Sequence, residues 1–85
     1  VTTSYAKTKM KQRGISEKMV IETLSNPEVS QPAYKNRYGV AKFFPEFKNG
    51  KYVVVIYEIE NNHIIVINAI PRDPKKVRKL EKRME

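Results

Sequence analysis

Residues 51–70 read KYVVVIYEIENNHIIVINAI, and this stretch decides the fold. The runs 51–60 and 63–70 are rich in Val, Ile and Tyr and predict two strands. Asn61-Asn62 between them can adopt the positive φ angles of a two-residue type I′ turn. The two strands therefore form an antiparallel hairpin. Counting outward from the turn places Glu60 opposite His63, Tyr57 opposite Val66 and Val55 opposite Asn68.

Two further strands precede this hairpin. Residues 38–47 are apolar and aromatic, and Asn49-Gly50 is the strongest short-range signal for a hairpin turn. A two-residue turn there places Phe47 opposite Tyr52 and Lys42 opposite Tyr57. Residues 28–34 make a weaker strand, which Pro32 restricts to a sheet edge. The four runs predict an antiparallel meander.

The first third of the chain has helical spacing. Residues 3–13 contain no helix breaker, and Gly14 can end a helix in the left-handed conformation. Ser16 is placed to cap a second helix, which Pro27 closes. We therefore expect a single α+β domain, residues 1–85. A helical hairpin (1–27) packs on the antiparallel sheet (28–70), and a basic C-terminal tail follows (71–85), helical over 75–85.

The composition favours a polyanionic partner. The chain has 85 residues, with 17 Lys and Arg against 9 Asp and Glu, for a net charge of +8. Nucleic acid is the first partner class that such a charge indicates. The alternative is that the lysines only keep a small protein soluble.

Several classes of site are excluded by residue counts. The chain has no Cys, one His and three Gly, which rules out disulfides, thiolate metal sites, a Ser-His-Asp triad and a phosphate-cradling loop. We expect no metal and no cofactor, and His63 is expected to lie exposed at a strand start. No apolar run is long enough for a membrane span or a signal peptide, so we expect a cytoplasmic location and no membrane partner.

The predicted register sorts the sheet into two faces. We expect the helices to cover the face that carries Phe43, Phe47, Tyr52, Val54, Ile56, Ile65, Ile67 and Ala69. The other face would carry Val40, Lys42, Phe44, Val53, Val55, Tyr57, Val66 and Asn68 and serve as the working surface. Opposed residues lie roughly 5 Å apart at Cβ, so Lys42 and Tyr57 could act on one ligand.

Charges at the rim would extend this surface. Lys35 and Arg37 precede the second strand, and Arg72 follows the last. Basic residues interleaved with aromatics suit a nucleic-acid backbone and its stacked bases. The alternative is that Lys42 and Tyr57 merely extend from a half-exposed sheet face.

The opening of the chain carries a family resemblance, in residues Ala6, Met10, Arg13, Gly14, Ile15, Ser16, Val20, Leu24, Asn26 and Pro27. It resembles a family of small uncharacterised domains that typically read His-Ala-x-x-Arg-Met-x-x-Arg-Gly-Ile-Ser. That family looks related to the BrnT and RelE/ParE toxins of toxin-antitoxin systems, whose fold is two helices against a curved antiparallel sheet. Tyr5 stands at the position of the family His, and Lys9 at that of the family Arg.

The resemblance implies a function. RelE-like relatives cleave RNA on the sheet with basic residues and a tyrosine, without a metal. By analogy, Lys42, Tyr57 and Arg72 would be catalytic in an endoribonuclease, because cations stabilise the pentavalent phosphate and another group moves the proton. Residues expected to bind the nucleic acid are Lys35, Arg37, Asn68, Lys75, Lys76 and Arg78.

The implied partners are RNA, with or without the ribosome, and an antitoxin protein, the domain being a monomer or a complex with that antitoxin. Two alternatives stay open. One is a binding module without chemistry for nucleic acid or protein, and the other is a gyrase-poisoning toxin. Fold alone does not choose among them.

Overall fold

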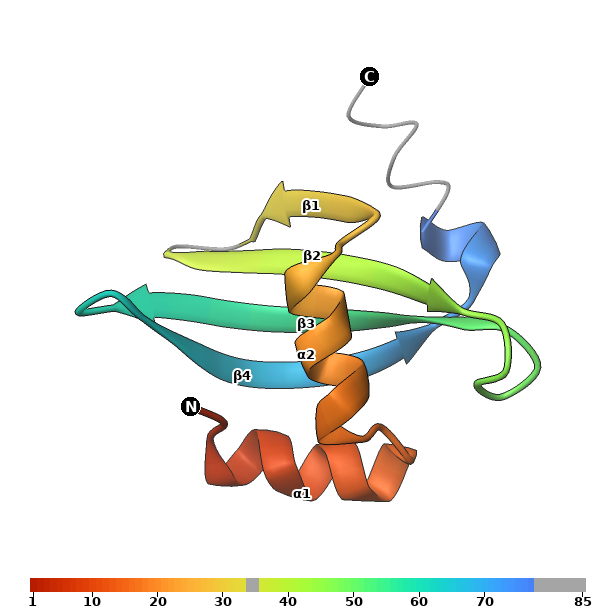
Figure 1. Cartoon of the computed structure of the whole chain (residues 1–85), viewed down its shortest axis with the longest axis horizontal. Coiled ribbons are helices and arrows are strands. Elements are labelled where there is room, and N and C mark those ends of the chain that lie inside the picture. Colours follow the sequence, from red (N-terminus) through yellow and green to blue (C-terminus); the bar gives the residue numbers. More distant parts are fainter. Residues whose placement is uncertain (34–35, 78–85) are drawn as a thin grey trace.

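A computed structural model describes residues 1–33 and 36–77. Its elements are α1 (Ser4–Arg13), α2 (Glu17–Ser25), β1 (Val29–Pro32), β2 (Arg37–Phe44), β3 (Lys51–Glu60) and β4 (His63–Arg72). The strands form one antiparallel sheet in the order β1-β2-β3-β4 (Figure 1). The predicted α+β meander is confirmed. A helical turn at residues 74–77 starts the expected tail helix, and the rest of that prediction, including Arg78, lies outside the described residues, as does Lys35.

The helix ends are set by local hydrogen bonds, as the sequence predicts. Gly14 takes the left-handed conformation (φ 72°) after α1. The Ile15 amide donates to the Met10 carbonyl (2.9 Å), the bond that typifies a Schellman ending. Ser16 then accepts a bond from the Met19 amide (3.2 Å) and caps α2. The two helices are therefore joined by a short, fixed corner.

The β3–β4 hairpin has the predicted turn. Asn61 and Asn62 both have positive φ (51° and 64°), and Glu60 lies opposite His63. The predicted pairing holds as far as Tyr57 opposite Val66.

Beyond that pair the register shifts by one residue. Ile56 lies opposite Asn68, so Ile67 is the extra residue of a β-bulge. Val55 consequently faces Ala69, and the predicted pairing of Val55 with Asn68 is wrong.

The β2–β3 connection differs from the prediction. β2 ends at Phe44, and residues 45–50 form a loop in which Lys48 and Asn49 are the positive-φ pair (47° and 63°). Pro45 has no N–H to donate to a ladder, which explains why the strand ends there.

The loop moves the register of β2 against β3 by four residues. Tyr52 lies opposite Phe43 rather than Phe47, and Lys42 lies opposite Val53 rather than Tyr57. Phe47, expected in a strand, packs from the loop against the hydrophobic core.

The helices cover the face that we expected to be the working surface, so that assignment is wrong. The buried core comprises Ala6, Met10, Ile15, Val20, Val40, Val53, Val55, Val66 and Ala69. We call the sheet side with Val40, Val53, Val55 and Val66 the covered face. The opposite side, with Val54, Ile56 and Ile70, is the open face. Side chains on both faces of β3 are apolar, so alternation alone could not select the buried one. The helices pack on the smaller Val and Ala side chains.

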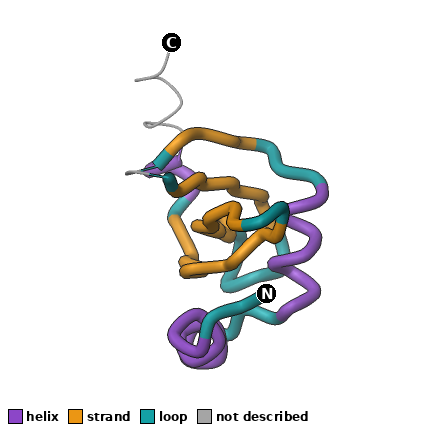
Figure 2. Tube along the Cα trace, turned by 90° about the vertical axis from the view of Figure 1, so that its left-hand side faces the viewer, coloured by secondary structure: helices purple, strands orange, loops and turns teal. Residues whose placement is uncertain are grey.

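The layers are visible in the side view (Figure 2), where α2 stands on one side of the strands. α2 contacts β2 and β3, whereas α1 lies along β4 at the sheet edge. Thr2 forms a bridge with Val66, so the chain before α1 also covers the outer edge of β4. Among the described residues, no helix has the length and hydrophobicity that a membrane span requires.

Candidate functional site

The three residues expected to be catalytic are not brought together. Lys42 and Tyr57 share the covered face, but Lys42 is opposite Val53, four residues from Tyr57 along β3. At about 3.4 Å per residue that separation is roughly 14 Å. Arg72 pairs with Tyr52 and lies on the open face. The sheet therefore separates Arg72 from the other two side chains.

Tyr57 has a packing role. Its ring stacks on Tyr38, with centroids 5.5 Å apart and planes at 27°. It is partly buried and packs against the core. The pair closes the covered face near the end of the β3–β4 hairpin.

Two of the residues expected to bind nucleic acid are engaged within the fold. Arg37 forms an ion pair with Glu58 (3.0 Å). The Asn68 Oδ1 accepts bonds from Arg13 Nη1 (2.9 Å) and from the Ala69 amide (2.9 Å). Asn68 thus fixes the bulge of β4.

Arg13 joins the helix layer to this bulge. Besides Asn68, its Nη1 donates to the Ala69 carbonyl at 2.9 Å. Both acceptors are neutral, so the two hydrogen bonds of this half-buried guanidinium bring no carboxylate to it. Sequence reasoning noted Arg13 only as a letter of the family motif, because the bulge that supplies its acceptors has no signal in the sequence.

A cationic surface that the sequence analysis did not single out lies on α1. We define the α1 cationic surface as Tyr5, Lys7, Lys9 and Lys11. The helix has no carboxylate, and the two ion pairs found among the described residues both lie elsewhere. Tyr5 is 56% exposed, and Lys9 Nζ lies 5.6 Å from the centre of its ring. Tyr5 and the partly exposed Lys9 therefore lie together on one flank of α1, and the exposed Lys7 and Lys11 lie on the other flank, since residues two apart on a helix do not share a face.

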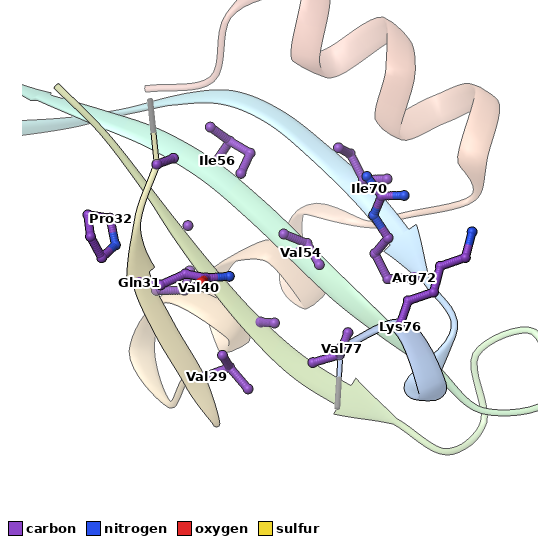
Figure 3. Close-up of a pocket in the computed structure, with 13 residues that line it drawn as sticks. Val29, Gln31, Pro32, Val40, Val54, Ile56, Ile70, Arg72, Lys76 and Val77 are labelled. Atoms are coloured by element: carbon purple, nitrogen blue, oxygen red, sulfur yellow. The ribbon is translucent and has the colours of Figure 1, made fainter. Parts of the chain in front are cut away.

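The open face contains a groove of about 530 Å³ between β1 and the 74–77 turn (Figure 3). Its floor is aliphatic and includes Val54, Ile56 and Ile70, with Gly39 leaving space beside Ile56. Arg72 and Lys76 extend on one side, from the end of β4 and from the turn. We call this cavity the open-face groove.

The turn that forms one wall is held by Asp73. The Asp73 carboxylate accepts a bond from the Lys75 amide (2.9 Å) and lies 3.5 Å from Lys51 Nζ. The backbone bond from Lys75, and then the charge of Lys51, lower the pKa of Asp73 below its usual value. Lys75 and Lys76, both expected to bind nucleic acid, are exposed here.

Metal-ligand groups do not converge in the part of the chain that the structure describes. No three His, Cys, Asp or Glu side chains among those residues could hold an ion together. His63 lies exposed at the start of β4, as expected, opposite Glu60.

Comparison with known proteins gives one match. The profile of a family described as a domain of unknown function, DUF4258, matches residues 2–71. No curated protein and no solved structure is significantly similar to the chain. The matched segment contains both helices and nearly the whole sheet.

Proposed function

We propose an RNA-binding function for this chain, which belongs to the DUF4258 family. One observation carries the proposal, and it concerns the motif over residues 5–16. Ala6, Met10 and Ile15 are buried in the core, and Gly14 and Ser16 form the helix corner. Core packing and helix capping therefore explain why these five residues stand at their positions in the motif.

Positions 5 and 9 of the motif have no such structural duty. Tyr5 is exposed, and Lys9, which is partly exposed, contacts the ring of Tyr5. They stand where the related family has His and Arg, so each position keeps the ability to stack on a base or to bind a phosphate. This supports a role in recognition.

The chemistry of the α1 cationic surface suits single-stranded RNA. Ammonium groups bind phosphates and release counterions, and an exposed aromatic ring stacks on unpaired bases. Base stacking contributes about 1–3 kcal/mol per base. Tyr5 and Lys9 would bind one base and a phosphate on one flank of α1, and Lys7 and Lys11 would bind phosphates where the RNA backbone crosses to the other flank.

The proposal is for binding without cleavage. Metal-independent cleavage by the expected residues needs Lys42, Tyr57 and Arg72 around one phosphate, and Arg72 is on the opposite side of the sheet. The resemblance to BrnT and RelE/ParE toxins supports a toxin-antitoxin setting, with RNA and an antitoxin as partners.

Salt-dependent binding to a labelled single-stranded RNA oligonucleotide tests the proposal. In Lys7→Gln/Lys9→Gln/Lys11→Gln, which keeps helix propensity nearly constant, the slope of log K against log salt should fall by about 2, since each phosphate contact on a single strand contributes about 0.7. Tyr5→Ala should weaken binding and Tyr5→Phe should restore it.

The matched control removes the same charge elsewhere. Arg72→Gln/Lys75→Gln/Lys76→Gln should leave the slope almost unchanged. A larger decrease of the slope in this control than in the α1 variant would show that RNA binds at the end of β4 and not on α1.

Gel analysis of the same RNA tests the absence of cleavage. If the wild-type chain cleaves the RNA and both Tyr57→Phe and Arg72→Gln abolish that cleavage, the proposal is contradicted and the ribonuclease assignment is restored. Inducible expression with a growth readout tests the toxin setting, and arrest that requires Tyr5 would support it.

A further inference from the structure

The open-face groove has the size and lining of a small-ligand site. Ligand pockets are typically about 300–1,000 Å³, mostly apolar, with a few polar groups that orient the ligand. The groove measures about 530 Å³. Its apolar lining comprises Val29, Pro32, Ala33, Val40, Ala41, Val54, Ile56, Ile70 and Val77.

The polar groups of the groove favour an anion. Arg72 and Lys76 lie together on one side, and neither takes part in the two ion pairs of the described residues. No Asp or Glu is among the lining residues, and Gln31 on β1 is the remaining polar side chain. A negative group at this side would meet two cations and no carboxylate.

The wall that carries Lys76 is built before any ligand arrives. Val77 is 3% exposed, so the turn is anchored by burial of its last described residue. The Asp73 carboxylate holds the start of the same turn through the Lys75 amide. Ordering this wall therefore costs a ligand little of its binding free energy.

The dimensions favour a small molecule over a protein partner. A standard protein interface involves about 20–30 residues a side. The groove is lined by 13 residues. At about 30 Å³ per water molecule, its 530 Å³ corresponds to roughly eighteen waters. That space suits a medium-length aliphatic chain with a compact head group.

We propose that the open-face groove binds an aliphatic carboxylate of medium chain length. The chain lies on Val54, Ile56 and Ile70, and the carboxylate pairs with Arg72 and Lys76. The site is on the open face, apart from the α1 cationic surface, so it does not depend on RNA binding.

Titration of the whole chain with dodecanoate below its micelle concentration tests the inference, with amide NMR shifts as the readout. One saturable site is expected, with the largest shifts at Gly39, Ala41, Val54 and Ile70. Dodecanol and dodecyltrimethylammonium are the matched probes without a negative charge, and both should bind at least tenfold more weakly. Shifts that spread over α1, or that never saturate, would overturn the proposal.

Two variants separate charge from shape. Arg72→Gln/Lys76→Gln should raise the dodecanoate Kd about tenfold to a hundredfold and leave the dodecanol Kd unchanged. Gly39→Leu, which projects a side chain beside Ile56, should weaken both probes. Thermal unfolding of each variant checks that the fold persists.

A membrane lipid head group offers the same chemistry from another source. Sedimentation with phosphatidylglycerol vesicles distinguishes the two sources. Vesicle binding that needs Arg72 and Lys76, without saturable binding of free dodecanoate, would overturn the assignment to a free carboxylate. RNA binding in these variants is measured separately, so failure of one proposal leaves the other intact.

Discussion

The two faces of the sheet have nearly the same hydrophobicity and different environments. Val53 and Val55 on the covered face are fully buried, whereas Val54 between them lines the open-face groove. The side chains of Val53 and Val55 therefore pack against the helix layer, and the identical side chain of Val54 between them lies in the groove. The comparison shows that the neighbouring layer, and not the hydrophobicity of the strand, decides which of these valines is fully buried.

The largest expected effect is the contrast between neighbouring valines. Val53→Ala should reduce the free energy of unfolding by about 2–3 kcal/mol, because it removes buried methyl groups and leaves a cavity. Val54→Ala should cost less than about 1 kcal/mol. Urea denaturation measures both, and equal losses would show that something covers the open face as tightly as the helices cover the other.

The link between the helix layer and the bulge comes next. Arg13→Gln should cost about 1–3 kcal/mol, because the Asn68 and Ala69 oxygens lose their donor in a half-buried place. Asn68→Ala is the partial control, since Arg13 keeps its bond to the Ala69 carbonyl. If Arg13→Gln unfolds at the same urea concentration as the wild type, water replaces the guanidinium at no cost.

A stabilising change is expected at the groove floor. A Cβ on Gly39 would lie 3.4 Å from Ile56 Cδ1, an ordinary contact, and its φ is not in the left-handed region. Gly39→Ala should therefore stabilise the fold by about 0.4–1 kcal/mol, mainly by restricting the unfolded chain. Gly14→Ala, at φ 72°, is the opposite case and should destabilise. A loss of stability at Gly39 would mean that the groove floor is tighter than its contacts indicate.

The smallest effect concerns pH and the groove wall. The folded pKa of Asp73 lies below the ordinary 3.8, so its contribution to stability is present above pH 3.8 and is lost as pH falls through the lower folded value. An NMR titration of the Lys75 amide shift should have its midpoint below 3.8, and Asp73→Asn should give a flat curve. A midpoint at or above 3.8 would refute the capping role.

Element order, helix corners and the Asn61-Asn62 turn could be predicted because short-range physics decides them. Positive φ at a type I′ turn and side-chain capping at Ser16 depend on few neighbours. The β2–β3 register could not be predicted from Asn49-Gly50 alone, since Pro45 ended β2 early and gave the loop six residues. Pro45 was the signal that pointed to this outcome.

The candidate site was harder to predict than the fold. Choice of the buried face needs one side of the sheet to be polar, and β3 offers Val, Ile and Tyr on both. The expected pairing of Lys42 with Tyr57 depended on the wrong register. The prediction for Arg72 did not consider which face of the sheet carries its side chain. The groove requires the 74–77 turn to fold over the sheet, which is a long-range contact without a sequence pattern.

The bulge at Ile67 divides β4 into two parts, in which different residues, even-numbered and then odd-numbered, point to the covered face. Before it, Val66 points to the helices, and after it Ala69 does, so the strand changes from even to odd residues on the covered face. Deleting Ile67 would restore an unbroken ladder without turning the later side chains over, because Asn68 would follow Val66 and keep its place opposite Ile56. Deleting a residue after the bulge would instead turn the later side chains of β4 over and exchange the core with the groove lining. Changes of length should thus be tolerated at Ile67 and in the 45–50 loop and selected against in the rest of β4.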